Sequence, residues 1–200
     1  MLSVQKMLND QGLDLLFRNA RSQNAWTTEP VSETLIRAVY DLTKMGPTSA
    51  NSSPARFIIL ASDAAKERLK PYLSANNVQK VMTAPICVIF GYDLTFHEKI
   101  PQLFPHNPAV KDWFSSSPAL AESTAFRNGT LQAAYFIMAA RALGLDCGPM
   151  SGFDNAGVDR EFFEGTTIKS NFICSIGHGD PKGLFPRSPR LSFEEACRIL

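Results

Sequence analysis

The sequence contains few of the residues that metal and disulfide chemistry require. Its 200 residues include four cysteines and three histidines, all widely separated. The cysteines form no C-x-x-C pair, so we expect free thiols in a reducing compartment. The histidines lack metal-ligand spacing and have no cysteine cluster beside them, so no metal site is predicted. The residues concerned are Cys87, Cys147, Cys174, Cys197, His97, His106 and His178.

Long apolar runs and concentrated charge are also absent. The runs "APICVIFGY" and "AAYFIMAA" are too short to span a bilayer, and the start "MLSVQKMLNDQG" lacks the apolar core of a signal peptide. The formal net charge is +1 with no long Lys/Arg run, which argues against a nucleic-acid surface. We therefore expect a soluble cytoplasmic protein that acts on a small molecule, without membrane or nucleic-acid partners.

Familiar catalytic motifs are incomplete. In "GPMSG" (148–152), Ser151 stands one position too late for the nucleophile motif G-x-S-x-G. In "GHGDPKG" (177–183), Lys182 occupies a position where the dinucleotide fingerprint needs glycine. Since neither a nucleophile nor a metal is indicated, a bound cofactor is the favoured source of reactivity.

Helical spacing of apolar residues predicts four helices. They cover 3–17, 32–45, 63–73 and 119–143. The first contains Gly12 as an interruption, and the last ends at Gly144. Ser32 and Asp63 are the predicted N-caps of the second and third helices. In the second helix Leu35, Ile36, Val39, Leu42 and Met45 share one side.

Three short apolar runs predict buried strands over 56–61, 84–92 and 171–179. Residues 92–118 are rich in proline and aromatics without a sustained period, which predicts an excursion with short helical pieces, or a lid. Strands and helices intermix with no linker between them. The expected fold is α+β, in a single domain over 1–200.

The stretch "GPTSAN" (46–51) lies between a predicted helix and a predicted strand. Its small, hydroxyl-bearing residues are typical of a turn. They are equally suited to presenting backbone N–H and hydroxyl groups to a polar ligand. The stretch alone leaves both interpretations open.

Four stretches, in this order, resemble the nitroreductase family of flavin enzymes. "RSQNAW" (21–26) is similar to the family's R-R-S-x-R-x-F, and "GPTSANSSPARF" (46–57) to its P-S-S-x-N-x-Q-P-W-x-F loop. "NNVQKVMTAP" (76–85) resembles N-x-x-K followed by Ala, and "GPMSGF" (148–153) resembles the P-x-E-G-F turn. The tail "FPRSPRL" (185–191) adds a basic segment where the family has one.

The resemblance implies a nitroreductase-like fold, with a central mixed β-sheet flanked by helices. It implies an intertwined homodimer in which the tail 179–200 embraces the partner, and FMN sites lined by both chains. NADH or NADPH would be the hydride donor. Because flavin N5 carries the hydride, no catalytic side chain of the protein is implied.

The resemblance also assigns roles to particular residues. The FMN phosphate would be bound from the front segment and the tail, and the loop after Gly46 would follow the ribityl chain and ring edge. Lys80 would stand beside N1 and O2 of the ring, and backbone N–H groups of the turn 149–152 would face N5. The implied cofactor-binding residues are Arg21, Ser22, Asn24, Pro47, Thr48, Ser49, Asn51, Asn77, Lys80, Pro149, Met150, Ser151, Gly152, Arg187 and Arg190.

Some positions depart from the family pattern. Ala20 and Asn24 stand where many members have basic residues, and Ser53 and Ala55 replace the usual Gln and Trp. The motifs look most similar to the malonic semialdehyde reductase branch, which would reduce 3-oxopropanoate to 3-hydroxypropanoate in pyrimidine degradation. The alternatives are a general nitro or quinone reductase and a non-catalytic flavin-binding protein. Candidate anchors for a substrate carboxylate are Arg56 and Arg127.

Overall fold

The centre of the molecule is a four-stranded sheet, described by a computed structural model that covers residues 7–200. The strand order is β1 (Ala55–Leu60), β2 (Ile86–Asp93), β4 (Ile168–Gly177) and β3 (Asp146–Met150), and each neighbouring pair is antiparallel. β1, β2 and β4 match the predicted strands within a few residues, whereas β3 was not predicted. Among the pairings of residues 7–200, only the isolated bridge Ser22–Cys147 is parallel, so the expected mixed sheet is mixed only there.

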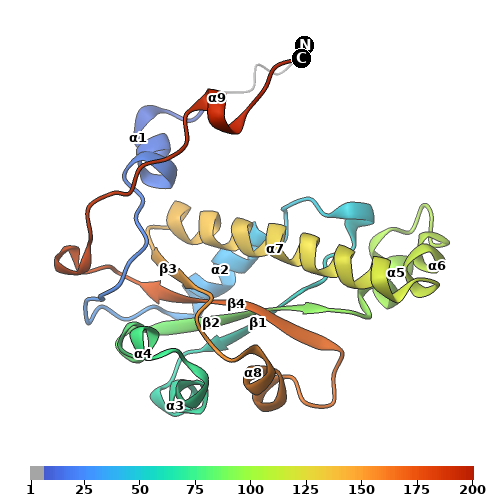
Figure 1. The fold of residues 1–200 in the computed structure, drawn as a ribbon, viewed down its shortest axis with the longest axis horizontal. Coiled ribbons are helices and arrows are strands. Elements are labelled where there is room, and N and C mark those ends of the chain that lie inside the picture. Colours follow the sequence, from blue (N-terminus) through green and yellow to red (C-terminus); the bar gives the residue numbers. More distant parts are fainter. Residues whose placement is uncertain (1–6) are drawn as a thin grey trace.

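Helices cover both faces of the sheet (Figure 1). On one face α2 (Glu33–Thr43) and α7 (Pro118–Ala142) enclose a core with Val39, Phe90 and Phe136. On the other face α3 (Asp63–Leu69), α4 (Ala75–Met82) and α8 (Asn155–Phe162) pack around Leu69 and Ile89. Side chains alternate between the two cores because successive strand residues point to opposite faces.

Local capping sets the helix bounds. The Ser32 hydroxyl accepts a hydrogen bond from the Leu35 N–H at 3.1 Å, which confirms the predicted N-cap of α2. For α3 the prediction was wrong by one residue, since Ser62 rather than Asp63 caps the helix. This helix ends at Leu69, and the 3-10 turn Lys70–Tyr72 follows it. After α7, Gly144 has a φ of 81°, as its predicted role as a helix stop requires.

The segment before α2 differs from the prediction. α1 (Asp10–Leu13) continues directly into a π-helical turn, Asp14–Arg18, so Gly12 does not interrupt the helix. Residues 3–6 of the predicted helix lie outside the described part of the chain. The N-cap of α1 is Asn9, whose side chain accepts from the Gly12 N–H.

The predicted excursion is present as short helical pieces. They are a 3-10 turn (Phe96–Lys99), α5 (Ile100–Leu103) and α6 (Val110–Ser115). Phe96, Ile100 and Phe114 are buried against the first turns of α7, so the excursion has a small apolar core of its own. This core fixes the excursion at the end of α7 that is far from β3 (Figure 1).

The tail after β4 lies on the surface. It contains the 3-10 turn Pro181–Gly183 and α9 (Phe193–Ala196), and residues 185–200 are all exposed. Its path runs beside α1, away from the sheet (Figure 1). Within residues 7–200, no helix has the length and apolar character that crossing a membrane requires.

Candidate functional site

The loop between α2 and β1 has an unusual backbone. Three residues other than glycine adopt left-handed φ angles there: Ala50 at 51°, Asn51 at 49° and Ser53 at 42°. The left-handed region of φ/ψ space costs roughly 1–2 kcal/mol per residue for most side chains, and Asn adopts it more readily than Ala. Such a conformation persists only where surrounding contacts hold it.

Two buried amides of α7 hold the two ends of this loop. The Asn128 Oδ1 accepts from the Ser49 N–H at 2.8 Å, and the Gln132 Oε1 accepts from the Ala55 N–H at 2.9 Å. Sequence analysis missed both residues. Their spacing of four residues within an apolar helix, which places them on one face, was the available signal.

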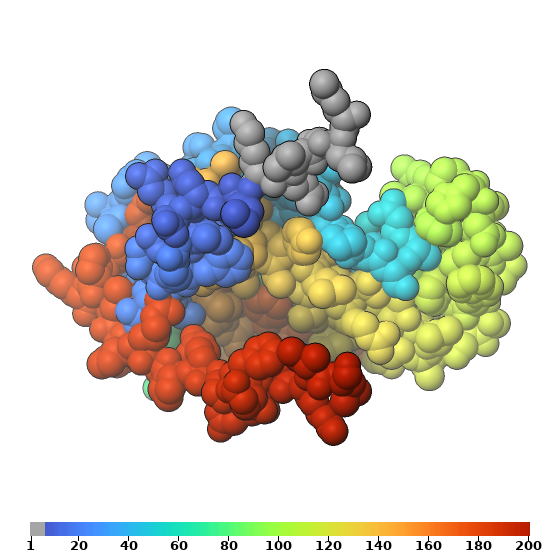
Figure 2. Space-filling model, turned by 90° about the horizontal axis from the view of Figure 1, so that it is seen from above, coloured from blue at the N-terminus to red at the C-terminus, as the bar shows by residue number. Residues whose placement is uncertain are grey.

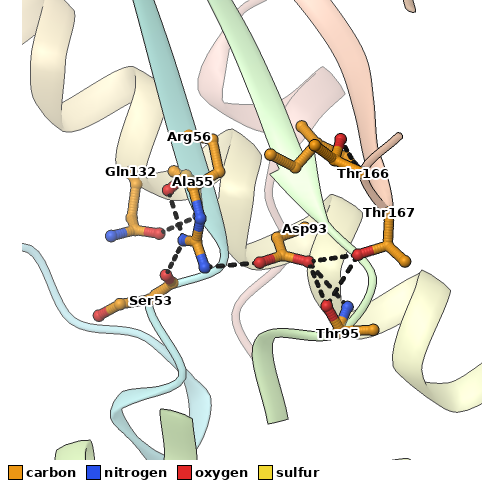
Figure 3. Close-up of polar contacts among 9 residues, drawn as sticks. Ser53, Ala55, Arg56, Asp93, Thr95, Gln132, Thr166 and Thr167 are labelled. Atoms are coloured by element: carbon orange, nitrogen blue, oxygen red, sulfur yellow. Dashed lines mark hydrogen bonds and ion pairs between the residues drawn. The ribbon is translucent and has the colours of Figure 1, made fainter. Parts of the chain in front are cut away.

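A charged pair holds the end of the same loop (Figure 3). The Arg56 guanidinium donates to the carbonyl oxygens of Ser53 at 3.1 Å and Ala55 at 2.9 Å, and to the Asp93 carboxylate at 2.7 Å. The other carboxylate oxygen accepts from the Thr95 N–H and from the hydroxyls of Thr95 and Thr167. Arg56 is thus engaged in the protein, which weakens its candidacy as a substrate anchor.

These contacts also set the ionisation of Asp93. Partial burial by itself would raise the pKa of this carboxyl group. The hydrogen bonds from Thr95 and Thr167 and the charge of Arg56 oppose burial and leave the pKa below its ordinary value. Asp93 is therefore an anion at neutral pH.

A second group of predicted residues gathers where α4 meets the turn after β3. The Gly152 carbonyl accepts from the Asn77 side-chain amide at 2.9 Å and from the Ser74 N–H at 3.0 Å. A Cβ at Gly152 would lie 2.8 Å from the Asn77 Nδ2, so only glycine allows this approach. The exposed Pro149 and the half-buried Met150 belong to the end of β3 rather than to the predicted turn, and Ser151 is exposed.

Lys80 lies one helical turn after Asn77 on α4. Its carbonyl oxygen accepts from the Trp26 indole N–H at 3.0 Å and from the Ser175 hydroxyl at 3.2 Å. Its side chain is half-buried, and its ammonium forms no hydrogen bond or ion pair with any residue in 7–200. The backbone is therefore fixed while the charge is left available for a ligand.

The front segment and the tail form a third group. The Arg21 guanidinium donates to the Phe185 carbonyl, and the Asn24 amide donates to the Gly183 carbonyl at 3.3 Å. Arg187 donates back to the carbonyls of Arg18 and Ala20 at 2.8 and 3.0 Å. Segments far apart in the sequence thus bring two predicted phosphate-binding arginines to the same few residues.

The other members of this group are arranged differently. Arg190 is exposed and donates only to carbonyls of its own segment, Ser188 and Pro189. Ser22 is exposed and pairs through its backbone with Cys147. The neighbouring Gln23, which sequence analysis did not single out, is buried, and its Oε1 has no partner within residues 7–200.

One chain therefore brings together only some of the predicted cofactor-binding residues. The Trp26–Lys80 bond and the Ser22–Cys147 bridge join the front segment to α4 and β3. The loop with Pro47, Thr48, Ser49 and Asn51 instead contacts the excursion and α7, as in the Asn51–Leu103 bond of 2.7 Å. In the described chain no hydrogen bond links this loop to the other two groups.

Two grooves of the described surface lie apart from these groups. A groove of about 760 Å³ between α2 and β1 is lined by Tyr40, Phe57 and Phe136 among others. Another, of about 550 Å³, lies on the outer side of α7 and includes Arg127 and Phe126. Neither contains a predicted cofactor-binding residue, although the second contains the candidate carboxylate anchor Arg127.

Comparison with known proteins agrees with the family that the four sequence motifs resemble. The family model described as "Nitroreductase family" matches residues 17–178. The chain belongs to the nitroreductase family. A Ralstonia pickettii protein named "Putative NADH dehydrogenase/NAD(P)H nitroreductase HadB" is 59% identical over 189 residues, which cover 94% of this chain and 96% of that protein.

Two further comparisons extend this result. A Cupriavidus pinatubonensis protein has the name "Putative NADH dehydrogenase/NAD(P)H nitroreductase Reut_A1586". It is 56% identical over 195 residues, which cover 96% of this chain and 100% of that protein. A solved structure from Exiguobacterium sibiricum, a "putative nitroreductase in complex with FMN", has a TM-score of 0.85 and 19% identity. It covers 98% of this chain and 99% of that chain, and at this identity it shows the shared fold.

Proposed function

We propose that this protein is an FMN-dependent NAD(P)H oxidoreductase. The observation that carries the proposal is Lys80, a half-buried cation whose backbone is fixed by Trp26 and Ser175. Its ammonium has no partner among residues 7–200. FMN and NAD(P)H agree with the names of the relatives and with the FMN-bound structural neighbour. The predicted reducing cytoplasm belongs to the same proposal, and all four cysteines are free thiols.

The residues present fit this cofactor. Arg21 and Arg187 each donate to backbone carbonyls through Nη2 alone within residues 7–200, so their other guanidinium nitrogens are left for the oxygens of a phosphate. The ammonium of Lys80 would stabilise negative charge on the pyrimidine side of a reduced ring, and Asn77 holds the turn that carries the Ser151 and Gly152 N–H groups. When bound, FMN supplies the centre that accepts a hydride from the nicotinamide and passes it on.

The proposal includes a homodimer, because the predicted site is divided within one chain. Figure 2 shows a hollow over α7, between the tail and the excursion. Several large apolar side chains are exposed on α2 and the turn after it, on α7 and along the tail, which is typical of an interaction surface. They are Tyr40, Leu42, Met45, Phe126, Leu131, Tyr135, Phe185, Leu191 and Phe193.

This arrangement gives the tail and the excursion their proposed roles. A second copy seated over α7 would bring its own 46–54 loop toward Lys80 and the turn 149–152. The tail 179–200 would embrace the partner, and the excursion 92–118 would act as a lid over the shared site. Sedimentation at low micromolar concentration tests the dimer, since a folded monomer that retains FMN would contradict a shared site.

The electron acceptor has three candidates. The relatives are named as nitroreductases, which favours a nitroaromatic, and a quinone is the alternative of the same general kind. The sequence resemblance favours malonic semialdehyde, whose carboxylate would need a cation such as the exposed Arg127. Oxidation of NADH and NADPH by FMN-loaded protein, measured with each acceptor in turn, separates these candidates. Failure of every acceptor to support turnover would favour the non-catalytic flavin-binding alternative.

A further inference from the structure

We infer that Arg56 and Asp93 form a positioning pair, which holds the loop 46–54 in the backbone conformation that binds FMN. The inference rests on the function proposed above. Arg56 lies within the motif 46–57 but is not among the residues that the resemblance assigns to the cofactor, and Asp93 lies outside all of the motifs. The pair joins the last turn of that loop to the end of β2 (Figure 3).

The loop needs such support because of its backbone. Ala50, Asn51 and Ser53 all have left-handed φ angles, and none is glycine. The two α7 amides accept from the N–H groups of Ser49 and Ala55. Between these positions the Asn51 amide donates to the Leu103 carbonyl and the Ser53 N–H donates to the Thr48 hydroxyl. The carbonyl of Ser53, the last residue with a left-handed φ, is held by the Arg56 guanidinium at 3.1 Å.

The geometry of Arg56 suits this task. One nitrogen of its guanidinium, Nη1, donates to the loop carbonyl of Ser53 and to the carbonyl of Ala55 at the start of β1, while Nη2 donates to Asp93. A lysine has a single charged nitrogen and cannot reproduce this planar fork. The arginine and aspartate side chains are 31% and 14% exposed, so solvent weakens the pair only in part.

Asp93 is fixed in turn from two other segments. It accepts from Thr95 at the start of the excursion and from Thr167 just before β4, and the two threonine hydroxyls lie 2.7 Å apart. The carboxylate is therefore fixed and holds the arginine in place. A movement of Ser53 has to break the hydrogen bond between its carbonyl and the Arg56 guanidinium.

A matched control exists in the contact between α3 and α8. Arg68 of α3 donates to the Glu161 carboxylate at 2.7 Å and to the Glu161 carbonyl at 3.3 Å, so it combines the same two kinds of contact. Neither partner contacts the loop 46–54 through any hydrogen bond of the described chain. Arg68→Lys thus makes the same chemical change at a pair that should not affect FMN.

The experiment compares Arg56→Lys, Asp93→Asn and Arg68→Lys in the full-length protein. Two quantities are measured: the Kd for FMN by titration of the apoprotein, and amide hydrogen exchange of the segment 46–57 without FMN. We expect Arg56→Lys and Asp93→Asn to raise the Kd about tenfold, equivalent to about 1.4 kcal/mol. Both should speed exchange in the loop, whereas Arg68→Lys should change neither quantity.

Three other outcomes would overturn the inference. If the Arg56 and Asp93 variants match Arg68→Lys in both measurements, the pair is an ordinary surface contact and the inference is wrong. Faster loop exchange with an unchanged Kd would show that the pair holds the loop without positioning it for FMN, which also overturns the inference. If the unmodified protein binds no FMN, the proposed function is wrong, and so is the inference about FMN positioning. Hydrogen exchange would still show in that case whether the pair holds the loop, so the two failures can be distinguished.

Discussion

Replacing Gln132 with leucine should destabilise the protein by removing one buried acceptor. Ala55 is only 8% exposed, and its N–H donates to the Gln132 Oε1 at 2.9 Å. Leucine has a similar volume but cannot accept, so this N–H would remain buried and unpaired. A buried donor without a partner costs about 1–3 kcal/mol. We expect a loss of about 2 kcal/mol in the free energy of unfolding.

The assay is urea unfolding of the apoprotein at one fixed protomer concentration, because ligand and dimerisation would both shift the apparent stability. For a chain of this size, a loss of 2 kcal/mol corresponds to a decrease of about 4–8 °C in Tm. Gln102→Leu is the matched control, since Gln102 is exposed on α5 and the chemical change is identical.

The control should change the free energy of unfolding by no more than about 0.5 kcal/mol. A Gln132→Leu variant within that range of the control would refute the reasoning that this amide holds the loop. A changed m-value would instead indicate an altered unfolded or native state, and the comparison would then use exchange at the Ala55 amide.

Four further predictions concern the charge, the thiols, the tail and the pH response. Lys80→Ala should keep the fold, because the Lys80 ammonium has no protein partner among residues 7–200, and it should lower the reduction potential of bound flavin. An unchanged reduction potential would make Lys80 an ordinary surface lysine. Burial raises the pKa of the Cys87 thiol to about 12, and of the four cysteines only Cys197 is exposed. A thiol reagent should therefore modify at most one cysteine per native chain and all four after unfolding. Truncation after Gly179 should abolish the dimer and FMN retention, and a truncated protein that stays dimeric and yellow would contradict tail exchange. Because the folded pKa of Asp93 lies below the unfolded value near 3.9, the stability difference between wild type and Asp93→Asn should be constant between about pH 5 and 7 and shrink below about pH 4.

Features set by neighbouring residues could be predicted from the sequence. The Ser32 cap, the stop at Gly144 and the strands β1, β2 and β4 all depend on local patterns. β3 was missed because its sequence, "DCGPM", contains the two residues that strand rules exclude. The structure tolerates Pro149 there because β3 is an edge strand and Pro149 is exposed.

Contacts between distant segments could not be predicted in the same way. Asn128 and Gln132 act on residues 79 and 77 positions away, so their partners follow only from the packing of α7 on the loop. Arg56 carries a charge suited to a substrate carboxylate, yet Asp93, which lies 37 positions away, engages it. For the candidate site, motif order identified the segments, but not which of them one chain brings together.

The most direct test of the proposed oxidoreductase function is an anaerobic titration of FMN-loaded protein with NADH and NADPH, followed by flavin absorption. We predict that at least one nicotinamide bleaches the oxidised flavin band stoichiometrically, and that adding an acceptor restores it. Protein that retains FMN but shows no bleaching with either nicotinamide would contradict the account.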